Sequence, residues 1–249
     1  MFSLNFTQHQ KKDITDAFDS LAQDYPECMR AQLGERLPSF TESDFSLLRE
    51  ADMDFYGMNY YTSQFARHRD EPALDTDFLG NLDELQENKQ GVSVGEKSGV
   101  HWLRSTPELF RKHLTRVYRT YGKPIYITEN GCPCPGEDKM TCEEAVNDTY
   151  RIQYFKDHLD AVGRARTEDG SNIKGYFAWS LMDNLGMCLG PYFKLFELIP
   201  LLEWSDGYGV RFGVTFTDYN TLERTPKQSA LLLKGMFDER MGGNASESK

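Results

Sequence analysis

The segment that most constrains the fold is a short apolar run, Pro124–Thr128, which ends abruptly in Glu129, Asn130 and Gly131. The run is typical of a short buried strand. Parallel α/β enzymes place reactive side chains at the carboxyl ends of such strands, with a tight turn directly after them. We therefore expect Glu129 to lie at the carboxyl end of a buried strand, where a catalytic carboxylate would stand.

Two further apolar segments, Asp54–Tyr61 and Lys174–Ser180, are also predicted to be strands. A helix is predicted after the first of them. Thr106 can cap it, Pro107 suits the first helical position, and Gly122 ends it.

A second helix is predicted to open at the capping-box pattern Thr141–Glu144 and to continue through Val162. Thr225 and Pro226 are expected to start a last helix that reaches about Phe237. Strands and helices therefore alternate, and this order predicts an α/β fold with a parallel sheet and outer helices.

The charge and the apolar pattern limit the possible partners. The chain of 249 residues has a net charge of −11 and no basic block, which argues against a nucleic acid or an anionic membrane. No apolar run reaches the roughly 20 residues that span a bilayer. The first residues contain no apolar core of a secretory signal, so we expect a cytoplasmic protein.

The cysteine pattern gives no metal site. Cys132 and Cys134 resemble half of a zinc knuckle, but no second Cys/His pair lies at zinc spacing. We expect reduced thiols, no metal and no cofactor.

Several stretches, taken in order, carry a resemblance over roughly residues 24 to 237. They are Asp24–Met29, Arg36–Thr41, Asp54–Ser63, Ile127–Gly131, Trp179–Asn184, Glu203–Gly209, Arg211–Gly213 and Arg224–Lys227. Together they resemble glycoside hydrolase family 1, the β-glucosidase family, and their wording is closest to intracellular fungal members. Each stretch is weak evidence by itself, but the ordered set is strong.

The resemblance implies a TIM (β/α)8 barrel and retaining hydrolysis of β-linked glucosides, with a β-glucoside or cello-oligosaccharide as substrate. It implies that Glu129 is the nucleophile, that Tyr61 holds Glu129 by a hydrogen bond and that Asn59 positions the sugar. The implied substrate-binding residues are Trp179, Glu203, Trp204 and Phe212.

The chain departs from the family in two ways. The family carries its acid/base glutamate in a Thr-Phe/Leu-Asn-Glu-Pro motif, and no such motif occurs here. Only about the last three βα units are recognisable, so we expect an incomplete barrel, since three parallel strands cannot close. In addition, the 17 residues 186–202 interrupt a motif that is continuous in the family, which suggests a retained intron.

These observations predict a divergent segment at 1–23, a barrel part at 24–240 with the insertion 186–202, and a disordered tail at 241–249. A complementary N-terminal half, or a second copy, could cover the open barrel edge. Without the acid/base, we expect little or no activity from this chain by itself. Two alternatives remain open: a non-catalytic carbohydrate-binding or regulatory fragment, and a truncated or mis-spliced product.

Overall fold

The computed structural model of the protein describes residues 25, 27–50, 53–70, 82–184 and 209–242. At its centre is a three-stranded parallel sheet in the order β1–β6–β7. The strands are Tyr56–Asn59 (β1), Ile125–Asn130 (β6) and Ile173–Ala178 (β7). The three predicted strands and their parallel arrangement are confirmed. β6 runs further than predicted and includes Glu129 and Asn130.

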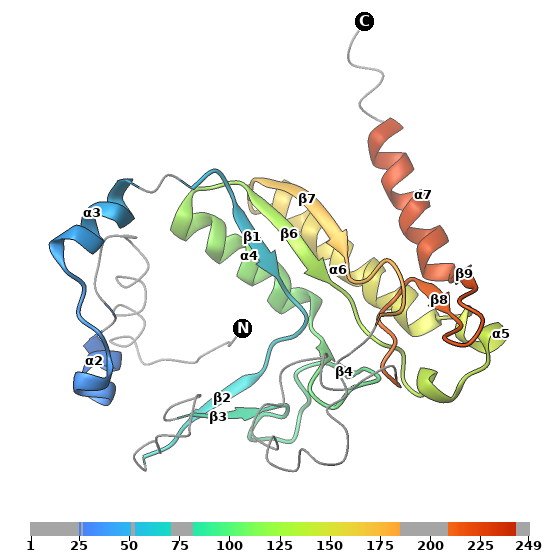
Figure 1. Cartoon of the computed structure of the whole chain (residues 1–249), viewed down its shortest axis with the longest axis horizontal. Helices are drawn as coiled ribbons and strands as arrows, with labels where there is room; N and C mark the ends of the chain where they lie inside the picture. The colour runs from blue at the N-terminus through green and yellow to red at the C-terminus, as the bar shows by residue number, and fades with distance from the viewer. Residues whose placement is uncertain (1–24, 26, 51–52, 71–81, 185–208, 243–249) are drawn as a thin grey trace, which may run out of the picture.

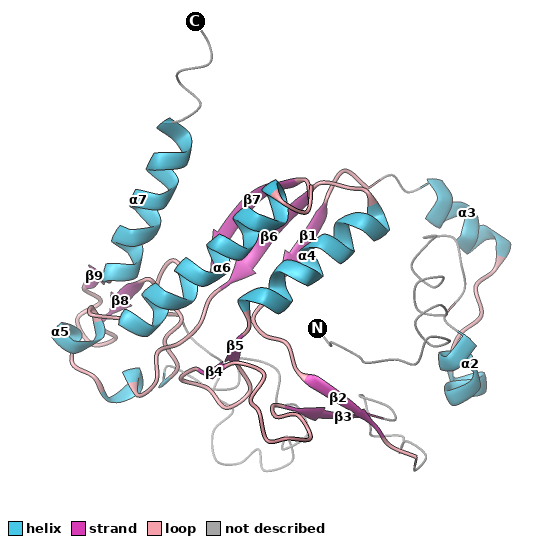
Figure 2. Ribbon diagram, turned by 180° about the vertical axis from the view of Figure 1, so that it is seen from behind, coloured by secondary structure: helices cyan, strands magenta, loops and turns pink. Residues whose placement is uncertain are grey.

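Two helices cover one face of this sheet (Figures 1 and 2): α4, Pro107–Tyr121, and α6, Thr149–Thr167. Apolar side chains of both helices bury Ile125 and Ile127 of β6 in a shared core. Burying one such side chain is worth about 1.5–3 kcal/mol. In Figure 1 the other face of the sheet is turned to the viewer, and no described helix or strand lies over it.

The remaining elements surround this unit. Before β1 come α2 (Glu27–Leu33), the 3-10 helix η1 (Gly34–Arg36) and α3 (Glu42–Glu50). After it come the antiparallel pairs β2 (Phe65–His68) with β3 (Leu82–Leu85) and β4 (Glu96–Lys97) with β5 (Arg104–Ser105). The C-terminal part holds η2 (Glu137–Lys139), α5 (Cys142–Ala145), β8 (Thr215–Thr217), β9 (Arg224–Pro226) and α7 (Gln228–Gly242).

Three sequence predictions about helix ends were wrong in part. Thr106 does precede α4, and Gly122 ends it in a left-handed conformation, but the Thr106 side chain does not cap the helix. Its buried hydroxyl instead bonds to the Tyr60 hydroxyl, at 2.9 Å. The Thr106 hydroxyl therefore makes a tertiary hydrogen bond in place of the helix cap.

The second predicted helix is two helices. Thr141 forms the expected capping box with Glu144, but α5 ends at Ala145 and α6 begins only at Thr149. The Val146 carbonyl accepts the N–H of Gln228, at 2.9 Å, so it is taken by the start of α7. The prediction of one helix used the local pattern alone, which contains no sign of the distant contact between Val146 and Gln228.

The last helix starts later than predicted. Thr225 and Pro226 belong to β9, which pairs with β8, and the Lys227 N–H then donates to the Val214 carbonyl. Proline has no N–H to donate, and it is tolerated in β9 because an edge strand does not need a donor at every position. α7 then begins at Gln228 and includes residues 241–242 of the predicted tail. The rest of the tail, the segment 1–23 and the insertion 186–202 lie outside the described residues.

A buried network of six charged side chains joins the C-terminal elements. Arg151 of α6 donates to Asp148, at 2.7 Å, and to Glu137, at 2.5 Å. Lys227 donates to Glu137, at 2.6 Å, and to Asp183, at 2.9 Å. Arg211 also donates to Asp183, at 2.6 Å. Three acids thus balance three bases.

Burial by itself raises the pKa of Glu137, but the neighbouring charges of Arg151 and Lys227 outweigh it and hold that pKa below its ordinary value. Glu137 is therefore an ionised partner in the network. Removing one member of such a network leaves an unpaired buried charge.

Replacing Lys227 with Met should lower the free energy of unfolding by about 3–5 kcal/mol, because Glu137 and Asp183 would each lose a charged donor. The matched control is Lys234→Met on α7, whose ion pair with Asp238 is exposed and should contribute far less to stability because solvent screens it. Urea unfolding of both variants checks the prediction. Equal stabilities would contradict it.

His158 of α6 is fully buried, stacked on Tyr154 with ring centroids 3.8 Å apart. Burial lowers its pKa to about 4. The folded state therefore takes up its proton only near pH 4, whereas the unfolded chain does so near pH 6.5. The stability that neutral His158 gives is complete above about pH 6.5 and is lost as the pH falls to about 4.

Between pH 6.5 and 4, the free energy of unfolding should therefore fall by roughly 3 kcal/mol less in His158→Leu than in the wild type, since one pKa unit is worth about 1.4 kcal/mol. Val162→Ala, a buried change on the same helix that removes no titratable group, supplies the control and should keep the wild-type pH dependence. Urea midpoints measured across this pH range give the comparison. A wild-type slope in the His158 variant would refute the buried neutral state.

Candidate active site

The carboxyl ends of the three parallel strands meet at one edge of the sheet. Asn59, the last residue of β1, is the register partner of Glu129 on β6. The Tyr60 N–H donates to the Glu129 carbonyl, at 2.9 Å, and the Trp179 N–H, just after β7, donates to the Asn130 carbonyl, also at 2.9 Å. The sheet therefore brings residues from three distant segments to the same place.

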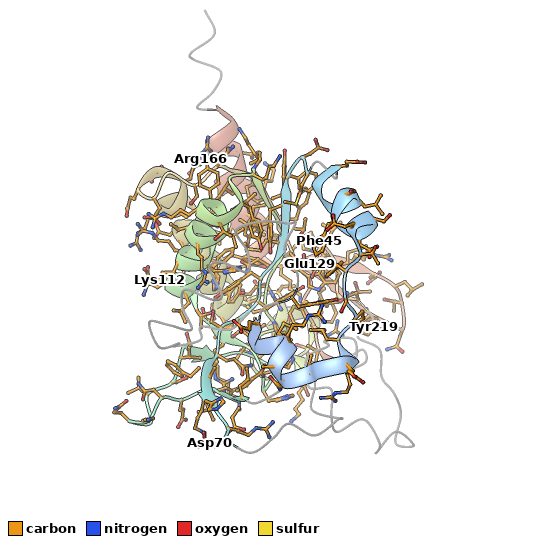
Figure 3. The ribbon with its side chains drawn as sticks, turned by 90° about the vertical axis from the view of Figure 1, so that its left-hand side faces the viewer. Phe45, Asp70, Lys112, Glu129, Arg166 and Tyr219 are labelled. Carbon is orange, nitrogen blue, oxygen red and sulfur yellow. The ribbon has the colours of Figure 1, made fainter. Side chains whose placement is uncertain are left out.

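Glu129 receives a hydrogen bond from Tyr61. The Tyr61 hydroxyl lies 2.7 Å from Oε2 of Glu129. Figure 3 labels Glu129 near the middle of the molecule. The carboxylate is partly buried, so it can meet a ligand while it keeps the hydrogen bond that orients it.

The Tyr61 ring is packed edge-on between two aromatic side chains. Its centroid lies 6.0 Å from that of Trp102 and 5.9 Å from that of Phe212, with interplanar angles of 76° and 90°. Phe212 is only 1% exposed. Phe212 is therefore packed against the Tyr61 ring, and its expected place in the lining of the pocket stays a prediction.

Asn59 is exposed on the side of the sheet that the helices leave open. Its Oδ1 accepts a hydrogen bond from the Thr128 hydroxyl, at 2.6 Å. Among the described residues its Nδ2 has no hydrogen-bond partner, so this amide group is free to donate to a ligand.

Trp179 lies close to the turn after Glu129. A Cβ added to Gly131 would stand 1.7 Å from the Trp179 carbonyl oxygen, so only glycine allows this approach. Within the described part of the chain, the buried indole Nε1 of Trp179 has no partner. The other two predicted binding residues, Glu203 and Trp204, lie outside the described residues.

Sequence reasoning assigned no role to Asn130, although it directly follows Glu129. Asn130 is fully buried, and its side chain bonds to the Tyr60 carbonyl, the Tyr154 hydroxyl and the Tyr176 hydroxyl. An amide at the end of an apolar strand was the available signal. Its partners come from distant elements, so the sequence could not identify them.

Cys132 and Cys134 are free and buried, as expected of reduced thiols. Burial raises the pKa of the Cys134 thiol to about 11. In residues 25–242, apart from the gaps named above, no group of three or more His, Cys, Asp or Glu side chains could hold a metal ion. No helix in the described part of the chain is long and apolar enough to cross a membrane.

The fold and the site together define a class of protein. Parallel strands alternate with outer helices, and polar side chains gather at the carboxyl ends of the strands, which is the arrangement of α/β enzymes of the TIM-barrel type. The chain belongs to glycosyl hydrolase family 1, whose pattern matches residues 7–241. The expected family is thereby confirmed.

Relatives support the same assignment. Beta-glucosidase 1B of Phanerodontia chrysosporium is 37% identical over 213 residues, which are 86% of this chain and 35% of that protein. Beta-glucosidase 4 of rice is 37% identical over 230 residues, covering 91% of this chain and 43% of its own.

Two solved fungal structures are also similar. The family 1 β-glucosidase of Humicola insolens in complex with glucose has a TM-score of 0.77 and 40% identity, over 91% of this chain and 44% of that chain. β-Glucosidase 2 of Trichoderma reesei in complex with Tris has a TM-score of 0.77 and 43% identity, over 91% and 45%. This chain spans less than half the length of these proteins and matches their C-terminal part.

Gly131→Ala should move the Trp179 carbonyl and lower the free energy of unfolding by about 1–3 kcal/mol or more, because the added methyl group meets backbone that must shift. Gly235→Ala in α7 is the matched control. Its added methyl group meets open space, and it should raise stability by up to about 1 kcal/mol. Urea unfolding and tryptophan near-UV circular dichroism provide the measurement. An unperturbed Gly131 variant would contradict the close approach.

Proposed function

We propose that this chain is the nucleophile-bearing part of a retaining β-glucosidase and that Glu129 is the nucleophile. One observation carries the proposal: in a family 1 chain, the Tyr61 hydroxyl lies 2.7 Å from Glu129 at the carboxyl end of β6. The relatives' names support a β-glucoside as the substrate. A terminal β-D-glucosyl residue of a cello-oligosaccharide is the other proposed substrate.

The proposed reaction has two steps. The Glu129 carboxylate attacks the anomeric carbon, a bond from that carbon to the carboxylate oxygen forms, and the bond to the leaving group breaks with its electron pair. Water then attacks the same carbon and releases the sugar and the carboxylate. The Tyr61 hydrogen bond keeps one carboxylate oxygen fixed, which leaves the other free to attack.

The remaining predicted residues keep their proposed roles. Asn59 offers its Nδ2 group to the sugar, and Trp179 offers an apolar platform. Glu203 accepts hydrogen bonds from sugar hydroxyls and Trp204 donates one. Phe212 lines the same pocket, with its ring against that of Tyr61. Polar groups matched to individual hydroxyls reject the wrong sugar, since an absent hydroxyl leaves a buried group unpaired.

The chain by itself is proposed to have little activity on ordinary glucosides. Its sequence contains no counterpart of the acid/base motif, and loss of a general acid costs about 10²–10⁴ in rate. Only about three βα units of the barrel are proposed to be present, and the cytoplasmic location stays a prediction.

A complementary N-terminal barrel half is the proposed partner. Among the described residues, β1 and β7 each pair along one edge only. On the side of the sheet that the helices leave open, Phe55 is 48% and Phe177 is 58% exposed. A surface of this kind favours a covering partner. Self-association through the same edges is the competing possibility.

The lack of an acid/base motif in this sequence leaves a second function open, a non-catalytic carbohydrate-binding or regulatory fragment. A truncated or mis-spliced product is the third reading. A single species that unfolds cooperatively would favour the binding fragment over the mis-spliced product, and aggregation would favour the reverse.

The test is intact-protein mass spectrometry after incubation with 2-deoxy-2-fluoro-glucosyl fluoride, whose leaving group needs no acid. We expect one added glycosyl group in the wild type and none in Glu129→Gln. Glu223→Gln, at an exposed position, is the matched control and should be labelled like the wild type. A folded wild type without the adduct would move the assignment to the binding fragment or to the truncated or mis-spliced product.

A further inference from the structure

We propose that Asn130 is the positioning residue that aims the Tyr61 side chain at Glu129. The kinetic part of this inference rests on the proposed function, whereas its structural part does not. Asn130 does not face the ligand side of the sheet, because it is fully buried beneath the strand ends.

The side-chain amide of Asn130 makes three hydrogen bonds, to three separate segments of the chain. Its Nδ2 group donates to the Tyr60 carbonyl, at 2.7 Å, and to the Tyr154 hydroxyl of α6, at 2.9 Å. Its Oδ1 accepts from the Tyr176 hydroxyl of β7, at 2.7 Å. One amide thus ties the end of β6 to β1, β7 and α6.

The network holds both peptide units that flank Tyr61. Asn130 binds the Tyr60 carbonyl, and the Tyr154 hydroxyl donates to the Tyr61 carbonyl, at 3.1 Å. These two carbonyls lie on either side of the Tyr61 Cα, so fixing them fixes the backbone direction from which the Tyr61 side chain projects. Trp102 and Phe212 then hold the ring.

The contacts form a closed ring. It runs from the Glu129 carboxylate to the Tyr61 hydroxyl, back along the chain to the Tyr60 carbonyl, to the Asn130 side chain and through one peptide bond to Glu129. A second backbone contact, from the Tyr60 N–H to the Glu129 carbonyl, braces it. A displacement of Asn130 therefore has to change the Tyr61–Glu129 hydrogen bond.

The first readout is the chemical shift of the Glu129 side-chain carboxyl carbon in protein labelled with ¹³C glutamate, with Glu129→Gln used for assignment. Tyr61→Phe removes the hydroxyl and defines the shift that belongs to the lost hydrogen bond. Asn130→Asp keeps the acceptor for Tyr176 but removes both donors. Tyr154→Phe keeps the ring and removes the hydroxyl that accepts from Asn130 and donates to the Tyr61 carbonyl.

We expect both Asn130→Asp and Tyr154→Phe to move the Glu129 resonance towards its Tyr61→Phe position. Val117→Ala, a buried change on α4 outside the network, is the control for a general loss of stability and should leave the resonance at the wild-type position. Labelling by the fluorosugar should slow about 10- to 100-fold in the three network variants, because misplacement by about 1 Å can cost that much.

A wild-type resonance in both Asn130→Asp and Tyr154→Phe, beside a shifted Tyr61→Phe, would overturn the proposal. An unshifted Tyr61→Phe would overturn it as well, since the hydrogen bond that Asn130 aims would be missing. If Asn130→Asp does not fold, Tyr154→Phe decides. Failure of the wild type to react with the fluorosugar would count against the proposed function only, because the resonance still tests the positioning.

Discussion

The C-terminal part of this structure depends on the buried charge of Arg151. Its guanidinium bonds to Asp148 and Glu137 and also to the backbone carbonyls of Cys132 and Arg211. A buried charge is tolerated only when it is paired and hydrogen-bonded. Each of the three guanidinium nitrogens of Arg151 has a partner, and the partners come from separate parts of the chain. The network therefore sets where α6, the turn after β6 and the segment before β8 lie relative to one another.

This arrangement reaches the candidate active site by two routes. The Cys132 carbonyl lies two residues beyond the end of β6, so Arg151 restrains the chain just after the proposed nucleophile. The Arg211 carbonyl precedes Phe212, whose ring packs against Tyr61. The hydrogen bonds of the buried Arg151 side chain thus also affect how Tyr61 is oriented toward Glu129. A site on strand ends is only as exact as the layer beneath it.

Apolar periodicity predicted the parallel sheet and the ordered motifs predicted the family, because both are signals that can be read along the chain. The contact between Tyr61 and Glu129 was expected only because the family resemblance implied it. The sequence could not predict that Thr106 would serve Tyr60, or that Gln228 would take the Val146 carbonyl and split a helix. It likewise missed the role of Asn130. In each case a polar group forms a hydrogen bond with a residue far away in the chain. A pattern within one segment carries no information about such partners.

The position of the ionic network has one more consequence. Asp183 stands just before residues 185–208, whereas Arg211 and Lys227 follow them, and all three are bonded within the network. The two sides of that segment are therefore joined by ionic contacts as well as by the covalent chain. A cut within 185–208 should leave two pieces that stay associated.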